Sequence, residues 1–140
     1  MVNFLYMDTC AAIKLFKQEE DSEALQNWLA DQASSRQITA HLTRTELRRG
    51  LHAAGASQET HARATAWLDR CAQIVLTAEV LDKAGKLAPN TSLRSLDALH
   101  VVAALELGSA LTYFVTYDKR LAAVAEAQGL TVIAPRELVA

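Results

Sequence analysis

Short apolar runs alternate with longer segments of helical periodicity along the chain. The first run, Phe4-Leu5-Tyr6-Met7, ends at Asp8-Thr9, as a buried strand followed by a helix N-cap would. The segment 111–116 is rich in β-branched and aromatic residues, which also favours a strand. On this basis we predict strands over residues 4–7, 37–40, 74–76, 111–116 and 131–133.

Between these runs, apolar residues recur every three or four positions, as they do on one face of a helix. We predict helices over residues 11–17, 22–33, 59–73, 78–87, 93–107 and 118–128, with a further helix that begins at Thr43. Thr43-x-x-Glu46 fits a capping box, and Gly108 and Gly129 end two of the helices. Strands that alternate with helices predict an α/β fold whose parallel sheet is covered on both faces.

The composition is that of one ordinary globular domain. With 140 residues, of which 51% are hydrophobic and 21% charged, we expect a single domain over residues 1–140. No apolar stretch approaches the ~20 residues that span a bilayer, and the N-terminus lacks the basic start of a signal peptide. We therefore expect a cytoplasmic protein without a membrane partner. Cys10 and Cys71 are far apart, which favours two small buried side chains over a disulfide or a zinc site.

The net charge of −2 at first argues against a nucleic-acid partner. If four acids surround a metal ion, however, they no longer oppose a polyanion, and removing four negative charges from −2 leaves +2 on the rest. Two basic clusters then stand out, Arg44, Arg48 and Arg49 in one and Lys83, Lys86 and Arg94 in the other. They are compatible with RNA binding, although arginines on a helix are also typical of a solvated face.

Two of those acids follow predicted strands. Asp8 comes directly after the first strand, and Asp118 comes just after the strand over 111–116. Because sites in parallel α/β sheets form outside the carboxyl ends of the strands, these two side chains could meet there. Asp is also a common helix N-cap and both residues open predicted helices, so capping is an equal alternative for each taken singly.

The other two acids lie on predicted helices. After Asp97, His100 is the only polar residue up to position 105, so this helix is buried, and an ionised carboxylate on it is costly unless it is paired or binds a metal. A pair with Arg94, three residues earlier, is the alternative. For Glu46 alone, a capping-box role or a pair with Arg49 is the better explanation, and the other three acids change that balance.

A divalent cation would remove the repulsion between clustered carboxylates. An oxygen-only ligand set suits Mg²⁺ or Mn²⁺ better than zinc. We therefore predict that Asp8, Asp97 and Asp118 hold Mg²⁺, for which Mn²⁺ can substitute. Glu46 would ligate a second ion or deprotonate the attacking water. Such a site supports metal-assisted hydrolysis of phosphodiester bonds.

Four segments resemble the acidic motifs of PIN-domain nucleases, in the same order along the chain. They are Phe4-Leu5-Tyr6-Met7-Asp8-Thr9-Cys10-Ala11, Thr43-Arg44-Thr45-Glu46-Leu47, Leu93-Arg94-Ser95-Leu96-Asp97-Ala98-Leu99-His100 and Phe114-Val115-Thr116-Tyr117-Asp118-Lys119-Arg120-Leu121. Their order and spacing, and the chain length, are similar to those of VapC-type toxins of bacterial toxin–antitoxin pairs. The resemblance implies a PIN-like three-layer α/β/α domain with a central, mainly parallel sheet.

The resemblance also implies a function and partners. Members of this family are Mg²⁺-dependent endoribonucleases that cut structured RNA, often tRNA or ribosomal RNA, and so inhibit translation. They pair with a cognate VapB-like antitoxin and usually form homodimers. Four apolar side chains could offer a groove for an antitoxin helix or belong to the core: Phe16, Leu25, Trp28 and Leu29.

One departure from the family pattern concerns the surroundings of the first acid. The residue two positions after it is often Ser in the family, and here it is Cys10. If that hydroxyl orients the metal or its water, Thr9 or Thr116 would have to supply it. Thr116 could fix the rotamer of a ligand carboxylate, although its β-branched side chain is equally consistent with a plain strand residue.

Three further residues are candidates for substrate contacts. Arg94 and Arg120 could bind phosphate, and a surface or helix-pairing arginine is the alternative for each. His100 lies one turn from Asp97 and could contact substrate, or it could be a buried histidine with satisfied hydrogen bonds.

Two other classes of protein compete with a nuclease. A receiver-type signalling domain also places acids and Mg²⁺ at strand ends, but it carries its phosphoacceptor Asp at a strand end near mid-chain, whereas Glu46 and Asp97 fall on predicted helices. The second is a catalytically inactive PIN-fold RNA- or protein-binding module. The intact set of four acids argues against it, since an inactive descendant has no reason to keep them.

Overall fold

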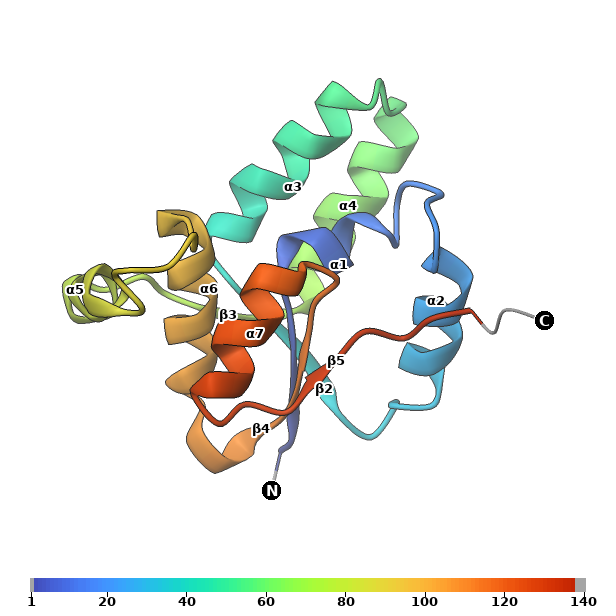
Figure 1. Cartoon of the computed structure of the whole chain (residues 1–140). Helices are drawn as coiled ribbons and strands as arrows, with labels where there is room; N and C mark the ends of the chain where they lie inside the picture. The colour runs from blue at the N-terminus through green and yellow to red at the C-terminus, as the bar shows by residue number, and fades with distance from the viewer. Residues whose placement is uncertain (1, 138–140) are drawn as a thin grey trace.

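The computed structural model describes residues 2–137 and has a five-stranded, all-parallel sheet at its centre (Figure 1). The strands are β1 (Phe4–Met7), β2 (Arg36–Ala40), β3 (Ala72–Ile74), β4 (Leu111–Val115) and β5 (Val132–Ile133). Their order is β3-β2-β1-β4-β5, so the chain builds one side of the sheet from β1 outwards and then crosses to the other. Receiver domains have the order 2-1-3-4-5, which excludes that alternative.

Helices cover both faces of this sheet, which gives three layers (Figure 1). One face carries α1 (Thr9–Ile13), α2 (Ser22–Ala30), α3 (Leu42–Ala53) and α4 (Gln58–Arg70). The other face carries α6 (Ser95–Leu105) and α7 (Lys119–Ala127), and α5 (Ala78–Lys86) packs against α6. A short 3₁₀ turn, Gly108–Ala110, leads into β4. Within residues 2–137, no helix combines the length and hydropathy needed to cross a bilayer.

The two faces of the central strands supply two separate cores, because side chains alternate along a strand. Met7 and Val115 point towards α1, α3 and α4, whereas Tyr6 and Phe114 point towards α6 and α7. The rings of Tyr6 and Phe114 stack with their centroids 5.1 Å apart and 3° between their planes. Burying a side chain of this size stabilises the fold by about 1.5–3 kcal/mol.

Several predicted element boundaries were wrong by a few residues. The strand expected at 74–76 spans Ala72–Ile74, because residues 72–74 pair with Ile38, Thr39 and Ala40 of β2, and α4 therefore ends at Arg70. The first helix ends at Ile13, and residues 14–17 close turns through backbone bonds such as Phe16 N–H to Ile13 C=O at 3.0 Å. The helices predicted over 22–33 and 93–107 span residues 22–30 and 95–105.

The capping box predicted at Thr43-x-x-Glu46 does not form. Helix α3 begins at Leu42, one residue earlier, and Thr43 is fully buried. Its hydroxyl lies 2.7 Å from that of Thr39, which donates to the Met7 carbonyl at 2.6 Å. Thr43 therefore connects α3 to the sheet, and Glu46 takes no part in a capping box.

The apolar side chains considered for an antitoxin groove belong to the core. Leu25 is fully buried, and Phe16, Trp28 and Leu29 pack against the cluster around it. The Trp28 ring lies 5.5 Å from that of Tyr113 in an edge-to-face arrangement. Leu25, Trp28 and Leu29 fix α2 to the sheet, and Phe16 packs on Trp67 of α4.

Candidate active site

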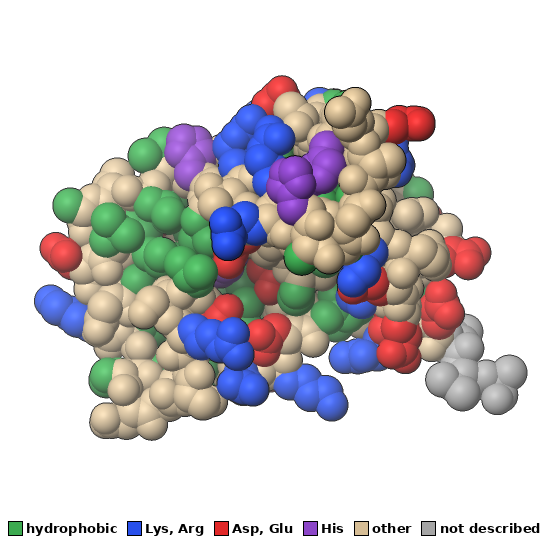
Figure 2. Space-filling view, turned by 90° about the horizontal axis from the view of Figure 1, so that it is seen from above, with side chains coloured by type: hydrophobic (Ala, Val, Ile, Leu, Met, Phe, Trp, Pro, Cys, Tyr) green, Lys and Arg blue, Asp and Glu red, His purple; other side chains and the backbone are tan. Residues whose placement is uncertain are grey.

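The four acids come from four different elements and meet at the carboxyl edge of the sheet. Asp8 follows β1, Glu46 lies on α3, Asp97 on α6, and Asp118 immediately precedes α7. They line one pocket of about 280 Å³ together with Thr9, Cys10, Ile13, Gly50 and His100. Figure 2 looks onto this edge and shows acidic side chains gathered near the centre of the face, with Lys and Arg side chains around them.

Asp8 is the most constrained of the four carboxylates, since its exposed fraction is 2%. Its Oδ1 accepts the backbone N–H of Ala11 at 2.9 Å and so caps α1. Its Oδ2 accepts the Thr116 hydroxyl at 2.6 Å, and the Cys10 thiol donates to both oxygens at 3.0 and 3.2 Å. Burial raises the pKa of Asp8, and the hydrogen bonds from Thr116 and Cys10 partly offset that effect. Capping and lining the pocket are therefore compatible roles for this residue.

Cys10 and Thr116 together surround Asp8 with donors. Burial, and then the charge of Asp8, raise the pKa of Cys10, so its sulfur stays a protonated donor. The backbone N–H of Tyr117 donates to this sulfur at 3.3 Å, and that of Asp118 donates to the Thr116 hydroxyl at 3.1 Å. The Cys10 thiol thus contacts both oxygens of Asp8, and Thr116 adds the shorter hydrogen bond.

Glu46 has partners that the sequence pattern did not indicate. Its Oε1 accepts the Thr9 hydroxyl at 2.6 Å and lies 2.8 Å from Nε2 of His100. Nδ1 of the same ring lies 2.6 Å from the Tyr6 hydroxyl. The capping-box role and the pair with Arg49 are both replaced by these contacts. One sequence feature could have indicated these contacts. His100 is the one polar residue between Ala98 and Leu105 of a buried helix, so it needs a polar partner.

Asp97 and Asp118 both line the pocket, and within residues 2–137 neither forms an ion pair. Burial, followed by the charge of Asp118, raises the pKa of Asp97. Asp118 caps α7, because its Oδ1 accepts the backbone N–H groups of Arg120 at 2.9 Å and Leu121 at 3.3 Å. The alternative pair of Asp97 with Arg94 is not formed: Arg94 is exposed at the N-cap of α6, and no ion pair joins the two within residues 2–137.

The chemistry of this donor set fits a hard divalent cation. In the described part of the chain, Asp8, Asp97 and Asp118 form no ion pair with Lys or Arg, and no group of three His, Cys, Asp or Glu side chains is placed to hold a metal ion by itself. Mg²⁺ suits such an open arrangement, because it keeps several waters and is held through one or two carboxylates together with substrate phosphate.

The basic clusters expected from the sequence are partly neutralised. Arg44 pairs with Asp69 at 3.1 Å, and Lys83 pairs with Glu79 at 3.0 Å and with Glu106 at 3.2 Å. Exposed cations nevertheless remain at the helix starts beside the pocket, namely Arg94, Lys119 and Arg120. Polyanion binding at this face would rely on these three residues more than on Arg44 and Lys83, which are paired with acids.

Comparisons with known proteins agree on one family. The PIN domain family model matches residues 5–127. Ribonuclease VapC35 of Mycobacterium tuberculosis is 41% identical over 133 residues, covering 94% of this chain and 96% of that protein. Ribonuclease VapC47 of the same species is 38% identical over the same shares of the two chains.

Solved structures share the fold. VapC20 of Mycobacterium tuberculosis, described as a toxin that cleaves the sarcin–ricin loop, superposes with a TM-score of 0.74 at 15% identity and covers 94% of this chain and 99% of its own. VapBC2 of Rickettsia felis, bound to a DNA fragment from its promoter, gives a TM-score of 0.72 at 14% identity, over 94% of this chain and 98% of that one.

Proposed function

Because this chain belongs to the PIN-domain family and is of the VapC type, we propose that it is a metal-dependent endoribonuclease that acts as a toxin in the cytoplasm. The observation that carries this proposal is the convergence of Asp8, Glu46, Asp97 and Asp118 from four elements on one pocket. Of these, Asp8, Asp97 and Asp118 form no ion pair within residues 2–137, and carboxylates gathered in this way are unfavourable by themselves and suit a site that binds a cation.

Mg²⁺, with Mn²⁺ as a substitute, would lower the pKa of a water molecule and offset the charge that develops on the phosphate. The chain's own contribution is orientation. Thr116 and Cys10 fix both oxygens of Asp8, and backbone N–H groups fix one oxygen of Asp118. Glu46 is placed to ligate a second ion or to accept a proton from the attacking water.

We propose structured RNA, either tRNA or ribosomal RNA, as the substrate. The exposed guanidinium groups of Arg94 and Arg120 stand at the starts of α6 and α7, beside Asp97 and Asp118. Such groups can contact phosphates on both sides of a scissile bond. Their removal should weaken RNA binding uniformly across sequences.

Cleavage of total cellular RNA tests the proposal. Purified protein with Mg²⁺ or Mn²⁺ should release discrete fragments, and end-mapping should place the cuts within tRNA or ribosomal RNA. EDTA and Asp97→Asn should abolish them, whereas Asp82→Asn, an exposed acid on α5, should leave them unchanged. RNA binding without cleavage by folded protein would instead favour a catalytically inactive PIN-fold binding module.

We further propose that a VapB-like antitoxin inhibits this chain. The support is the likeness to toxin–antitoxin assemblies such as VapBC2. The uncompensated carboxylates of the pocket would accept a basic side chain from the antitoxin in place of the cation. Expression of the chain alone should stop incorporation of labelled amino acids into protein. Co-expression of a cognate VapB-like antitoxin should restore it, and growth that is unaffected by the chain alone would count against a toxin.

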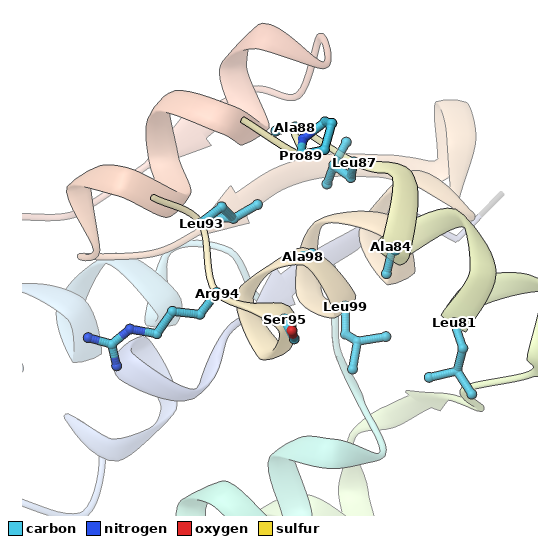
Figure 3. A pocket seen from close by; sticks show the side chains of 11 residues that line it. Leu81, Ala84, Leu87, Ala88, Pro89, Leu93, Arg94, Ser95, Ala98 and Leu99 are labelled. Atoms are coloured by element: carbon cyan, nitrogen blue, oxygen red, sulfur yellow. The ribbon is translucent and has the colours of Figure 1, made fainter. Parts of the chain in front are cut away.

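A homodimer is the last part of the proposal. An apolar groove runs between α5, the loop that follows it and the start of α6 (Figure 3). In the described residues, Leu81 and Leu96 on these helices are about half exposed, at 47% and 50%. Leu81→Glu and Leu96→Glu should shift the mass measured by light scattering from dimer to monomer, and Val2→Glu should not. A wild-type protein that is monomeric in the same measurement would refute the homodimer.

A further inference from the structure

A chain of hydrogen bonds leads from the interior of the sheet to Glu46 in the pocket. Tyr6 lies on β1 and is fully buried, and its hydroxyl is 2.6 Å from Nδ1 of His100. The exposed fraction of His100 is only 2%, and its Nε2 lies 2.8 Å from Oε1 of Glu46. A buried histidine with both ring nitrogens engaged has a defined orientation and little freedom to move.

The position of the proton on this ring follows from its partners. The Tyr6 side chain is fully buried, and its neutral phenol has one hydrogen to place. The contact that this hydroxyl makes with the His100 ring is to Nδ1, at 2.6 Å. Nδ1 is therefore the acceptor, and the ring carries its proton on Nε2, where it can donate to Glu46.

Two donors consequently share one oxygen of Glu46. The Thr9 hydroxyl and the Nε2–H of His100 both reach Oε1, at 2.6 and 2.8 Å. In the described chain no donor is bound to Oε2. Glu46 is thus fixed in one rotamer, with one oxygen fully engaged and the other left for an ion or a water molecule.

We propose that His100 is a positioning residue, fixed by Tyr6 in its Nε2–H tautomer, which holds Oε1 of Glu46 and leaves Oε2 to act in the cleavage reaction. The inference rests on the proposed nuclease function. It assigns Tyr6, a residue of the apolar core, a second role beyond stacking on Phe114. Partners of this kind behind a site residue typically contribute roughly 10- to 100-fold to activity or metal affinity.

The tautomer can be read directly by NMR of uniformly ¹⁵N-labelled, metal-free protein. Long-range ¹H–¹⁵N spectra of the histidine rings distinguish a protonated nitrogen from an unprotonated one, and the His100 signals are assigned by their loss in His100→Gln. We expect a protonated Nε2 and an unprotonated Nδ1 in the wild type. Tyr6→Phe, which keeps the stacked ring, should weaken this preference, because the contact with Glu46 alone would then maintain it. A protonated Nδ1 in the wild type would overturn the inference.

Kinetics provide the second readout. Tyr6→Phe should lower kcat by roughly 10-fold with KM for RNA unchanged, because substrate does not contact the phenol. Tyr113→Phe is the matched control, since it also removes one hydroxyl from a sheet strand, and within residues 2–137 that hydroxyl has no hydrogen bond. His100→Gln, which retains an N–H donor, should be more active than His100→Ala. Equal kcat for Tyr6→Phe and Tyr113→Phe would overturn the inference.

The two proposals can fail separately. The tautomer is measured without metal or RNA, so an unexpected tautomer refutes the role of His100 whatever the activity. An inactive wild type with the expected tautomer refutes the nuclease function instead.

Discussion

Asp97 is held half-buried on α6, where burial and the nearby charge of Asp118 raise the pKa of its carboxyl group. Without a cation, this carboxylate is therefore less stable in the folded protein than in the unfolded chain. A bound cation would offset both the burial of this carboxylate and its repulsion from Asp118. The same surroundings therefore make Asp97 a good metal ligand.

Asp97→Asn should stabilise the metal-free protein at neutral pH, by roughly 2–4 °C in Tm, while abolishing cleavage. The cost of Asp97 arises as the pH increases from the ordinary Asp pKa through the raised value in the folded protein, and it is complete above that value. Thermal unfolding from pH 3 to 8 should thus show the variant and the wild type converging in acid. A variant less stable than the wild type at pH 7 would contradict this account.

The cysteines should be unreactive in the native protein. Burial raises the pKa of Cys71 to about 12 and that of Cys10 further still, so neither forms appreciable thiolate at pH 8. Labelling by a disulfide reagent should be slow in buffer and complete within minutes in guanidinium chloride. Rapid native labelling of Cys10 would show that its thiol is not held against Asp8.

The sequence pattern located the acids but not the contacts that orient them. Asp8 and Asp118 could be placed at one edge because parallel strands end there. The bonds of His100 to Glu46 and Tyr6 span 54 and 94 residues, and no local periodicity encodes them. An isolated polar residue in a buried helix signals that a partner exists, and only the fold identifies it.

Helices α1 and α3 approach closely at Gly50, one turn after Glu46. A Cβ atom built at Gly50 would lie 2.8 Å from Cδ1 of Ile13 on α1, whereas one built at Gly85 on α5 would meet nothing within 4 Å. The close approach brings Thr9 of α1 to Glu46 of α3.

The two glycines form a matched pair for mutagenesis. Gly85→Ala should stabilise the protein by about 0.5–1 kcal/mol, which is the difference in helix propensity. Gly50→Ala should lose most of that gain because Ile13 must rotate away, and Gly50→Leu should force α1 and α3 apart and lower both stability and kcat. Urea unfolding with an unchanged m-value would measure these differences. Equal stabilisation by the two alanine variants would contradict a close contact at Gly50.

Where the periodicity was strong, the sequence predicted whether a segment is a helix or a strand. It did not predict the residues at which each element begins and ends. β3 occupies residues 72–74 because its register with β2 decides which residues are extended, although the apolar run 74–76 looks more strand-like. Thr43 satisfied the local capping pattern, yet its hydroxyl is bonded to Thr39 in the buried layer below α3. In both cases a tertiary contact overrode a local preference.

At the scale of the whole molecule, the pocket combines elements from both faces of the sheet. Glu46 comes from the face that carries α3, and Asp97 comes from the opposite face, which carries α6. The strand order that brings them to one edge could not be derived from the pattern alone, because alternating strands and helices are compatible with several orders. A cation bound here would join the two layers.

Mg²⁺ or Mn²⁺ should therefore raise the Tm of the intact protein, with a concentration dependence set by the dissociation constant. At a hundredfold excess over that constant the gain is about 2.7 kcal/mol. Asp118→Asn should reduce the shift, and Asp82→Asn should retain it in full. Differential scanning calorimetry with EDTA as reference measures both, and a wild type that is indifferent to millimolar Mg²⁺ would speak against the metal.

The central position of β1, between β2 and β4, also determines when activity can arise during translation. Asp8 is synthesised well before Thr116, which donates to it and follows 108 positions later. A nascent chain that has reached only α6 has three acids but lacks β4 and Asp118 beside them. The proposed toxin thus cannot attack the ribosome that is making it until β4 and Asp118 have been synthesised and have joined the sheet.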